Sequence, residues 1–143
     1  MSKLRFYKMS YNAFLIAMSQ MASKKKARVV VNDHLIFIEA LNRKNRWKMF
    51  TKVFHSSGYI PPSVQDCLAS AEFLRWQYQG AYLKLDPLTQ SLYLVKEIEM
   101  PVGKYIPFRH HLNEFIVAAD EWKEMLECFA ENDRVYTRAC NYS

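Results

Sequence analysis

Apolar residues in the first half of the chain change from a helical spacing to the alternation of strands. Residues 9–23 carry apolar side chains at the spacing of one helical face, and Ser10 is a good N-cap for them. Residues 27–41 are rich in β-branched residues divided by the turn Asn32-Asp33, and residues 46–54 alternate after a polar turn at 42–45. This pattern predicts a helix followed by a three-stranded antiparallel meander. The apolar face of the helix consists of Tyr11, Phe14, Leu15, Met18, Met21 and Ala22.

The second half of the chain predicts a helix, a hairpin and a final helix. The first of these should begin near Ser63 or Val64 and end before Gly80. Two alternating segments between 80 and 101 flank the turn residues Asp86-Pro87. Residues 108–130 form the clearest amphipathic helix, and the polar residues from 131 are expected to fray. The stripe of this last helix is Phe108, Leu112, Phe115, Ile116, Ala119, Trp122, Leu126 and Phe129.

The element order is therefore α-β-β-β-α-β-β-α, which indicates an α+β fold. Strands from distant parts of the chain can join one twisted antiparallel sheet covered by helices. A chain of 143 residues that is 50% hydrophobic is long enough for one domain with a real core. We expect a single domain over 1–143, with its core at about 10–130 and a polar C-terminal tail at 131–143.

Residues able to carry out chemistry are sparse and lack the spacing of a known active site. The chain has no GxSxG motif of a serine nucleophile, no GxGxxG motif and no phosphate-binding P-loop, and it holds only 3 Gly. His110, His111 and Glu114 could share a helix face, but a zinc site needs a further ligand, so an exposed polar helix start is the simpler interpretation. We expect no catalytic residue, no metal, no cofactor and no enzymatic activity. The three cysteines, which fit reduced thiols in a cytoplasmic protein, are Cys67, Cys128 and Cys140.

Positive charge is concentrated in the first 60 residues. They hold 12 Lys and Arg against 2 Asp and Glu, whereas residues 61–143 hold 8 against 12, which together give the net charge of +6. The segments "KKKAR" and "NRKNRWK" interleave cations with Trp47 and could contact nucleic acid, although a solvated turn and helix end explain them as well. No apolar run is long enough to span a bilayer, and the apolar run near the N-terminus is shorter than that of a secretory signal.

The chain has more large apolar side chains than its predicted inward-facing positions can hold. It contains 3 Trp, 9 Tyr and 9 Phe. Some of those outside the inward positions could belong to a core with a different register. Together they favour an interface, because large exposed apolar patches mark binding surfaces. The chain is therefore expected to bind another chain, itself included. The residues outside the inward positions are Phe37, Phe50, Phe54, Trp76, Tyr82 and Tyr93.

Three stretches resemble the class I type III secretion chaperones of bacteria, the CesT/SycE-like family. The first is the opening helix with "ARVVVNDHLIFIEAL", the second is "CLASAEFLRWQYQGAYLKLDPLTQSLYLVKEIEM", and the third is "FRHHLNEFIVAADEWKEML". Together they span about residues 10–130. The resemblance rests on hydrophobic patterns and element order.

The resemblance implies a small cytoplasmic dimer that binds the extended N-terminal region of a type III secreted protein or secretion regulator. Such a chaperone keeps its cargo soluble and secretion-competent and targets it to the export apparatus, using apolar pockets and exposed strand edges. The implied cargo-binding residues are Phe14, Leu15, Met18, Ile36, Ile38 and Met49. The implied dimer-interface residues are Leu68, Ala71, Leu74, Tyr78 and Leu83.

The charge of this chain departs from the pattern of that family, whose members are typically acidic. The excess of cations lies in the half of the chain where cargo would bind. It points to an acidic cargo, an acidic partner subunit or a second role, and the alternative to a chaperone is a small basic domain that binds nucleic acid or modulates transcription. Either a homodimer or a heterodimer with a second chaperone subunit fits the resemblance.

Overall fold

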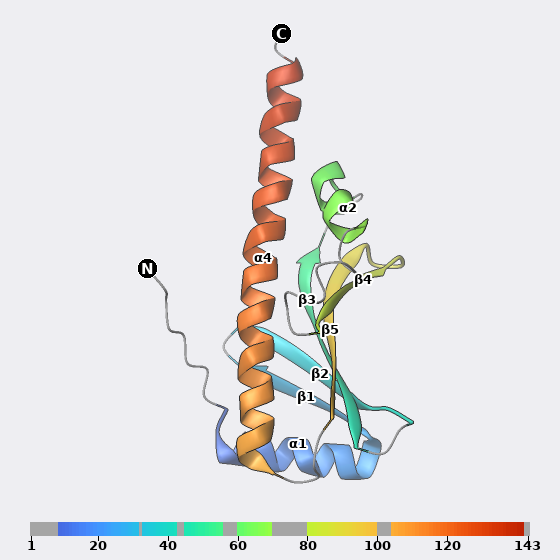
Figure 1. Cartoon of the computed structure of the whole chain (residues 1–143), viewed down its shortest axis with the longest axis vertical. Helices are drawn as coiled ribbons and strands as arrows, with labels where there is room; N and C mark the ends of the chain where they lie inside the picture. Colours follow the sequence, from blue (N-terminus) through green and yellow to red (C-terminus); the bar gives the residue numbers. More distant parts are fainter. Residues whose placement is uncertain are drawn as a thin grey trace.

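The computed structural model describes residues 9–31, 33–42, 45–55, 60–69, 80–99 and 104–141, with the backbone alone for 67–69 and 134–141. The order of its elements confirms the predicted α-β-β-β-α-β-β-α pattern (Figure 1). The elements are α1 (Tyr11–Lys24), β1 (Lys26–Val31), β2 (His34–Ala40), β3 (Arg46–His55), α2 (Pro62–Ala69), β4 (Tyr82–Asp86), β5 (Ser91–Glu99) and α4 (Tyr105–Asn141).

The five strands form one antiparallel sheet in the order β1-β2-β3-β5-β4. The predicted meander is confirmed as β1, β2 and β3, and the hairpin of β4 and β5 joins it through the pairing of β3 with β5. The sheet and its helices confirm the α+β fold class. Strands β1 and β4 are the two edges of the sheet. One row of directly paired residues crosses all five strands, and it consists of Arg28, Phe37, Phe50, Val95 and Tyr82.

Helix α1 begins where the sequence predicts, but its buried face only partly overlaps the predicted one. The Ser10 side chain accepts a hydrogen bond from the backbone N–H of Ala13 at 3.1 Å and caps the helix. The buried residues are Phe14, Ala17 and Met21. Tyr11, Leu15 and Ala22 of the predicted face are exposed instead. The reason is that α1 has apolar residues around most of its circumference, so that spacing alone does not select the face that packs.

Helix α4 is longer than predicted at both ends, since it begins at Tyr105 and continues to Asn141. Its 37 residues make it about 55 Å long, and Figure 1 shows its C-terminal end projecting beyond the other elements. Pro107 is tolerated in the first turn, where its missing N–H has no partner to lose. The predicted end at 130 was wrong because no Gly or Pro interrupts the chain after Pro107. The carboxylate of Asp133 also accepts hydrogen bonds from the N–H and hydroxyl groups of Ser63 in α2.

The core lies between one face of the sheet, here named the inner face, and helices α1 and α4. The predicted stripe of α4 is confirmed, apart from Phe129, which is only partly buried. The inner face contributes buried residues from every strand: Ala27, Val29, Val31, Ile36, Ile38, Met49, Val53, Leu83, Leu92, Leu94 and Ile98. At the N-terminal end of α4, the rings of Phe108 and Tyr105 lie 5.7 and 5.1 Å from that of Phe14.

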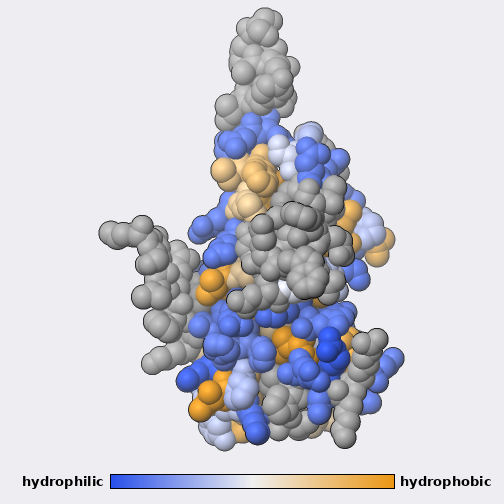
Figure 2. Space-filling model, in the orientation of Figure 1, coloured by the Kyte–Doolittle hydropathy of each residue, from blue (hydrophilic) through white to orange (hydrophobic). Residues whose placement is uncertain are grey.

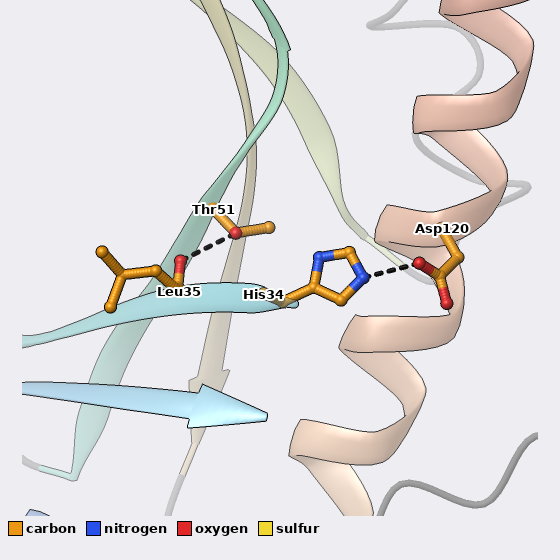
Figure 3. Close-up of polar contacts among 4 residues, drawn as sticks. All are labelled: His34, Leu35, Thr51 and Asp120. Carbon is orange, nitrogen blue, oxygen red and sulfur yellow. Dashed lines mark hydrogen bonds and ion pairs between the residues drawn. The ribbon is translucent and has the colours of Figure 1, made fainter. Parts of the chain in front are cut away.

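One polar contact joins β2 to α4, and a second joins β2 to β3 (Figure 3). Nε2–H of the buried His34, at the start of β2, donates a hydrogen bond to the carboxylate of Asp120 in α4 at 2.5 Å. The hydroxyl of Thr51 on β3 donates to the carbonyl of Leu35 on β2 at 2.8 Å. These bonds satisfy polar groups that would otherwise be buried without partners. They also fix β2 relative to the middle of α4.

Lys96 brings a positive charge beneath the N-terminal half of α4. The register places it opposite the buried Met49, on the inner face, and its ammonium lies 3.9 Å from the carboxylate of Glu114. His111 is half-buried beside them. Burial and the positive charge of Lys96 lower the pKa of His111, although Glu114 acts in the opposite direction. The folded protein therefore favours the neutral form of this imidazole.

The first prediction concerns the buried stripe of α4. Trp122→Ala should lower the free energy of unfolding by about 3–5 kcal/mol, because it removes the largest fully buried side chain of the core. Val117→Ala is the matched control on the same helix, since Val117 is exposed and its truncation should cost about 0.5 kcal/mol or less. Chemical denaturation measures both. Equal effects of the two variants would contradict the packing described here.

The second prediction concerns His111 and pH. Because its pKa is lowered in the folded state, the unfolded chain takes up the proton first as pH falls through the ordinary histidine value of about 6.5. His111 therefore makes the folded protein less stable at acidic pH. His111→Gln should remove this contribution, so that unfolding free energies at pH 7.5 and 5.5 differ less in the variant than in the original chain. A larger loss on acidification in the variant would contradict the assignment.

Candidate functional site

The predicted cargo-binding residues divide into a buried group and an outward group. Phe14, Ile36, Ile38 and Met49 lie in the core between α1 and the inner face, and Met18 packs partly buried against it. Leu15 is 47% exposed. The space between α1 and the sheet is thus filled by the chain's own side chains, and only the outer side of α1 presents apolar surface to solvent.

The predicted dimer-interface residues lie mostly outside the described part of the chain. Leu83 is buried on the edge strand β4. For Leu68 only the backbone is described, in α2, and Ala71, Leu74 and Tyr78 fall outside the described residues. Gly80, just before β4, has a φ of +85°, a conformation that favours glycine at the position where the predicted helix was to stop.

The exposed side of α1 presents apolar residues, of which the predicted apolar face included Tyr11 and Leu15 but not Ile16. Tyr11 and Ile16 are 56% and 59% exposed, next to Leu15 in the helix. Ile16, Gln20 and Lys24 follow one another at intervals of four residues and so share one side of the helix. The side-chain oxygen of Gln20 accepts a hydrogen bond from the backbone N–H of Arg28 at 3.2 Å. That side of α1 therefore runs along the edge of β1.

The free edge of β1 has backbone groups that point away from the sheet. Lys25 provides the carbonyl for Ala40, so odd-numbered residues here face β2. Lys26, Arg28 and Val30 consequently direct their N–H and C=O groups outward, and Gln20 satisfies the N–H of Arg28. Unpaired strand edges of this kind are able to accept another strand.

The face of the sheet opposite the helices, here named the outer face, holds most of the surplus aromatic residues. The rings of Phe37 and Phe50 stack with centroids 5.2 Å apart, and Phe50 lies 6.1 Å from Tyr93. Together with Tyr82 these residues are half-buried, as their place on the outer face predicts. Phe54 differs, because an irregularity in pairing between Lys52 and Phe54 lets it pack against the core. Trp76 lies outside the described residues.

Two apolar side chains are exposed to solvent on the outer face near the turn between β1 and β2. Val30 is 70% exposed, and its cross-strand partner Leu35 is 41% exposed. Directly opposed apolar pairs normally cover each other or are covered by a neighbouring strand. On the side of the molecule in view, Figure 2 shows apolar patches separated by hydrophilic surface.

A groove of about 250 Å³ lies where the end of α1 meets β1 and β2. No loop separates α1 from β1, because Lys25 alone makes the turn, with a φ of 57° and its N–H bonded to the carbonyl of Met21. The lining residues are Gln20, Lys24, Lys26, Ala27, Arg28, Phe37, Ile38 and Glu39. The groove thus combines an aromatic side chain with several cations.

Two carboxylates on the outer face form ion pairs with cations of neighbouring strands. Glu39 lies 3.4 Å from Lys48, and Glu97 lies 3.6 Å from Arg46. Such exposed pairs contribute little to stability, but they cancel charge locally. Within the described residues, Lys24, Lys25 and Arg28 have no carboxylate partner. These three cations lie together at the junction of α1 and β1, whereas Lys52 and Lys84, which also lack a carboxylate partner among the described residues, lie on β3 and β4.

Groups that could support catalysis or bind a metal do not assemble at this surface. Among the described residues, no three His, Cys, Asp or Glu side chains lie close enough together to hold a metal ion. Glu114, considered above with His110 and His111, contacts both Lys96 and His110. None of the described helices is long and apolar enough to cross a membrane.

Comparison with known proteins identifies the fold. No family model and no curated protein matches this chain by sequence. Several solved structures are similar in three dimensions, including the following two. A chain of the ExsC–ExsE complex superposes with a TM-score of 0.59 and 16% sequence identity, covering 80% of this chain and 92% of that chain. A chain of the HopA1–SchA chaperone–effector complex gives 0.57 and 13%, covering 80% and 93%.

The likeness extends over nearly the whole of both solved chains. Identities of 13–16% are low, so the shared feature is the arrangement of helices and strands. The expected resemblance to class I type III secretion chaperones is thereby confirmed in the fold, reached from hydrophobic patterns alone. This chain therefore has the fold of a chain in the HopA1–SchA chaperone–effector complex and of a chain in the ExsC–ExsE complex.

Proposed function

We propose that this protein is a cytoplasmic chaperone for a type III secreted effector or secretion regulator. It binds the extended N-terminal region of that cargo, keeps it soluble and secretion-competent and targets it to the export apparatus. The proposal is supported by the fold shared with the HopA1–SchA chaperone–effector complex and the ExsC–ExsE complex. No enzymatic activity is proposed.

The observation that carries the proposal is the combination of apolar surface with an available strand edge. Leu15 and Ile16 are exposed on α1, Val30 and Leu35 are exposed on the outer face, and the edge of β1 lies between them. An extended polypeptide added beside β1 would bond to the outward backbone groups and place alternate side chains on the two apolar surfaces. Burial of these side chains supplies the affinity.

The cargo-binding residues then act in two ways. Leu15 and Met18 contact the cargo from α1. Phe14, Ile36, Ile38 and Met49 are buried beneath them, so they hold α1 in place against the sheet and contribute to binding through that support. For this reason a charged substitution at Phe14 would unfold the chain before it could report on binding.

Assembly into a dimer is part of the proposal. It places the second protomer, or a second chaperone subunit, at the other edge of the sheet, where Leu83 lies on β4. Edge strand β4 and the segment before it would form the interface, which leaves β1 free for cargo. The interface residues are Leu68, Ala71, Leu74, Tyr78 and Leu83.

Nucleic-acid binding, the alternative function, has less support from the outer face. Glu39, Glu97 and Glu99 lie there among the cations of β1 and β3. A phosphate backbone needs a continuous track of positive charge, and these carboxylates interrupt it.

The third prediction tests cargo binding with variants of the full chain. Ile16→Glu and Leu15→Glu should each weaken retention of a co-purifying polypeptide, recovered from the native cell and identified by mass spectrometry, by roughly tenfold or more. The reason is that the carboxylate would be buried against apolar cargo. Leu88→Glu is the control, because Leu88 is 94% exposed at the hairpin turn, away from β1.

Circular dichroism should show the same helix content in all three variants. If Leu15→Glu and Ile16→Glu retain the polypeptide as well as Leu88→Glu does, the apolar side of α1 is not where cargo binds.

A further inference from the structure

We propose that the groove at the junction of α1 and β1 binds an acidic segment of the cargo, in which carboxylates alternate with apolar side chains. This inference rests on the proposed chaperone function and names the chemistry of the polypeptide that the site accepts. It explains why this chain is basic in its first half, with 12 cations against 2 carboxylates in residues 1–60.

The first supporting observation is the arrangement of unmatched cations. Lys24 is the last residue of α1, and Lys25 makes the turn. Arg28 is the third residue of β1, which begins at Lys26. Partial negative charge at the C-terminal end of α1 favours cations here, but it is too small to neutralise them. Ligand carboxylates would complete the balance of charge.

The second observation is the shape of the groove. On the outer face, one pair of opposed residues is Arg28 and Phe37, and the next pair is Lys26 and Glu39. The strand backbone between these pairs forms the floor, and Gln20 and Lys24 of α1 close the side at the strand edge. A ligand side chain in the groove therefore meets the ring of Phe37 on one side and ammonium or guanidinium groups on the other.

The third observation is the state of the single carboxylate in the lining. Glu39 has Lys26 opposite it on β1 and Lys48 at 3.4 Å on β3, so its charge is already compensated. It does not offset Lys24, Lys25 or Arg28. The groove consequently retains a positive potential that attracts anionic segments and repels basic ones.

A polypeptide fits this site better than a nucleic acid. The volume of about 250 Å³ holds one or two side chains, and the free edge of β1 offers backbone partners that a nucleotide cannot pair in register. Nucleic-acid strands bind along extended cationic tracks with stacked bases. The cations here form one cluster, whereas the exposed Lys52 and Lys84 lie singly on β3 and β4.

The fourth prediction tests this with defined probes and the full chain. The probe is a fluorescein-labelled peptide whose central residues alternate valine and glutamate between flanking serines. Matched peptides carry glutamine or lysine in place of glutamate, and a labelled twelve-nucleotide oligothymidylate tests the nucleic-acid alternative. Fluorescence anisotropy at 50 and 200 mM NaCl should show binding of the acidic peptide roughly tenfold tighter than the glutamine peptide at low salt, with the difference reduced at high salt.

Variants that lack two cations test whether the acidic peptide binds at the groove. The double variant Lys24→Gln and Arg28→Gln should weaken binding of the acidic peptide roughly fivefold or more. The control, Lys52→Gln and Lys84→Gln, removes the same charge from exposed positions on β3 and β4 and should change binding less than twofold.

The outcomes separate this inference from the proposed function. Equal affinity for acidic and glutamine peptides, or equal effects of the two double variants, would overturn the acidic assignment even where native cargo is still retained. Tighter binding of the oligothymidylate than of the acidic peptide would overturn it as well. Loss of native cargo in the Leu15 and Ile16 variants bears on the chaperone function alone.

Discussion

The packing of α4 against the inner face of the sheet is the interaction on which the rest of the structure depends. Its apolar stripe, from Phe108 to Ala130, fills the core along β3 and β5, and α1 closes the same core beside β1. His34 and Asp120 attach β2 to the middle of this helix. Because both helices occupy the inner face, the outer face and the edge of β1 are left for interactions with other molecules. The location of the proposed binding surface follows from the core occupying the inner face of the sheet.

The proposed binding surface combines three features of the described residues. Exposed apolar residues lie on α1 and on the outer face, and outward backbone groups of β1 lie between them. In the proposed site, cations at the end of α1 would add selectivity for charge. Apolar burial would supply affinity, and strand pairing would set the direction of the cargo. The cations would favour acidic cargo sequences over basic ones. Each contribution comes from different residues, so each can be removed separately.

The sequence predicted the order of elements and most core positions, because alternation in strands and the stripe of α4 are strong periodic signals. It misjudged α1, where apolar residues such as Leu15 and Ile16 surround the helix and only the position of β1 decides which side packs. It missed the irregularity that turns Phe54 toward the core, since pairing defects leave no mark in hydropathy. The cation cluster was visible as "KKKAR", but its place beside Phe37 depends on the register of β1 with β2.

The most direct test of the account is amide hydrogen exchange on the full chain, alone and bound to its native polypeptide. The account predicts that exchange at the outward amides of Lys26 and Val30 slows roughly tenfold or more on binding, together with protection of α1. The hairpin turn at 87–90 should be unchanged. Protection confined to β4 or to the hairpin, with β1 exchanging as in the free protein, would contradict the claim that cargo binds at the edge of β1.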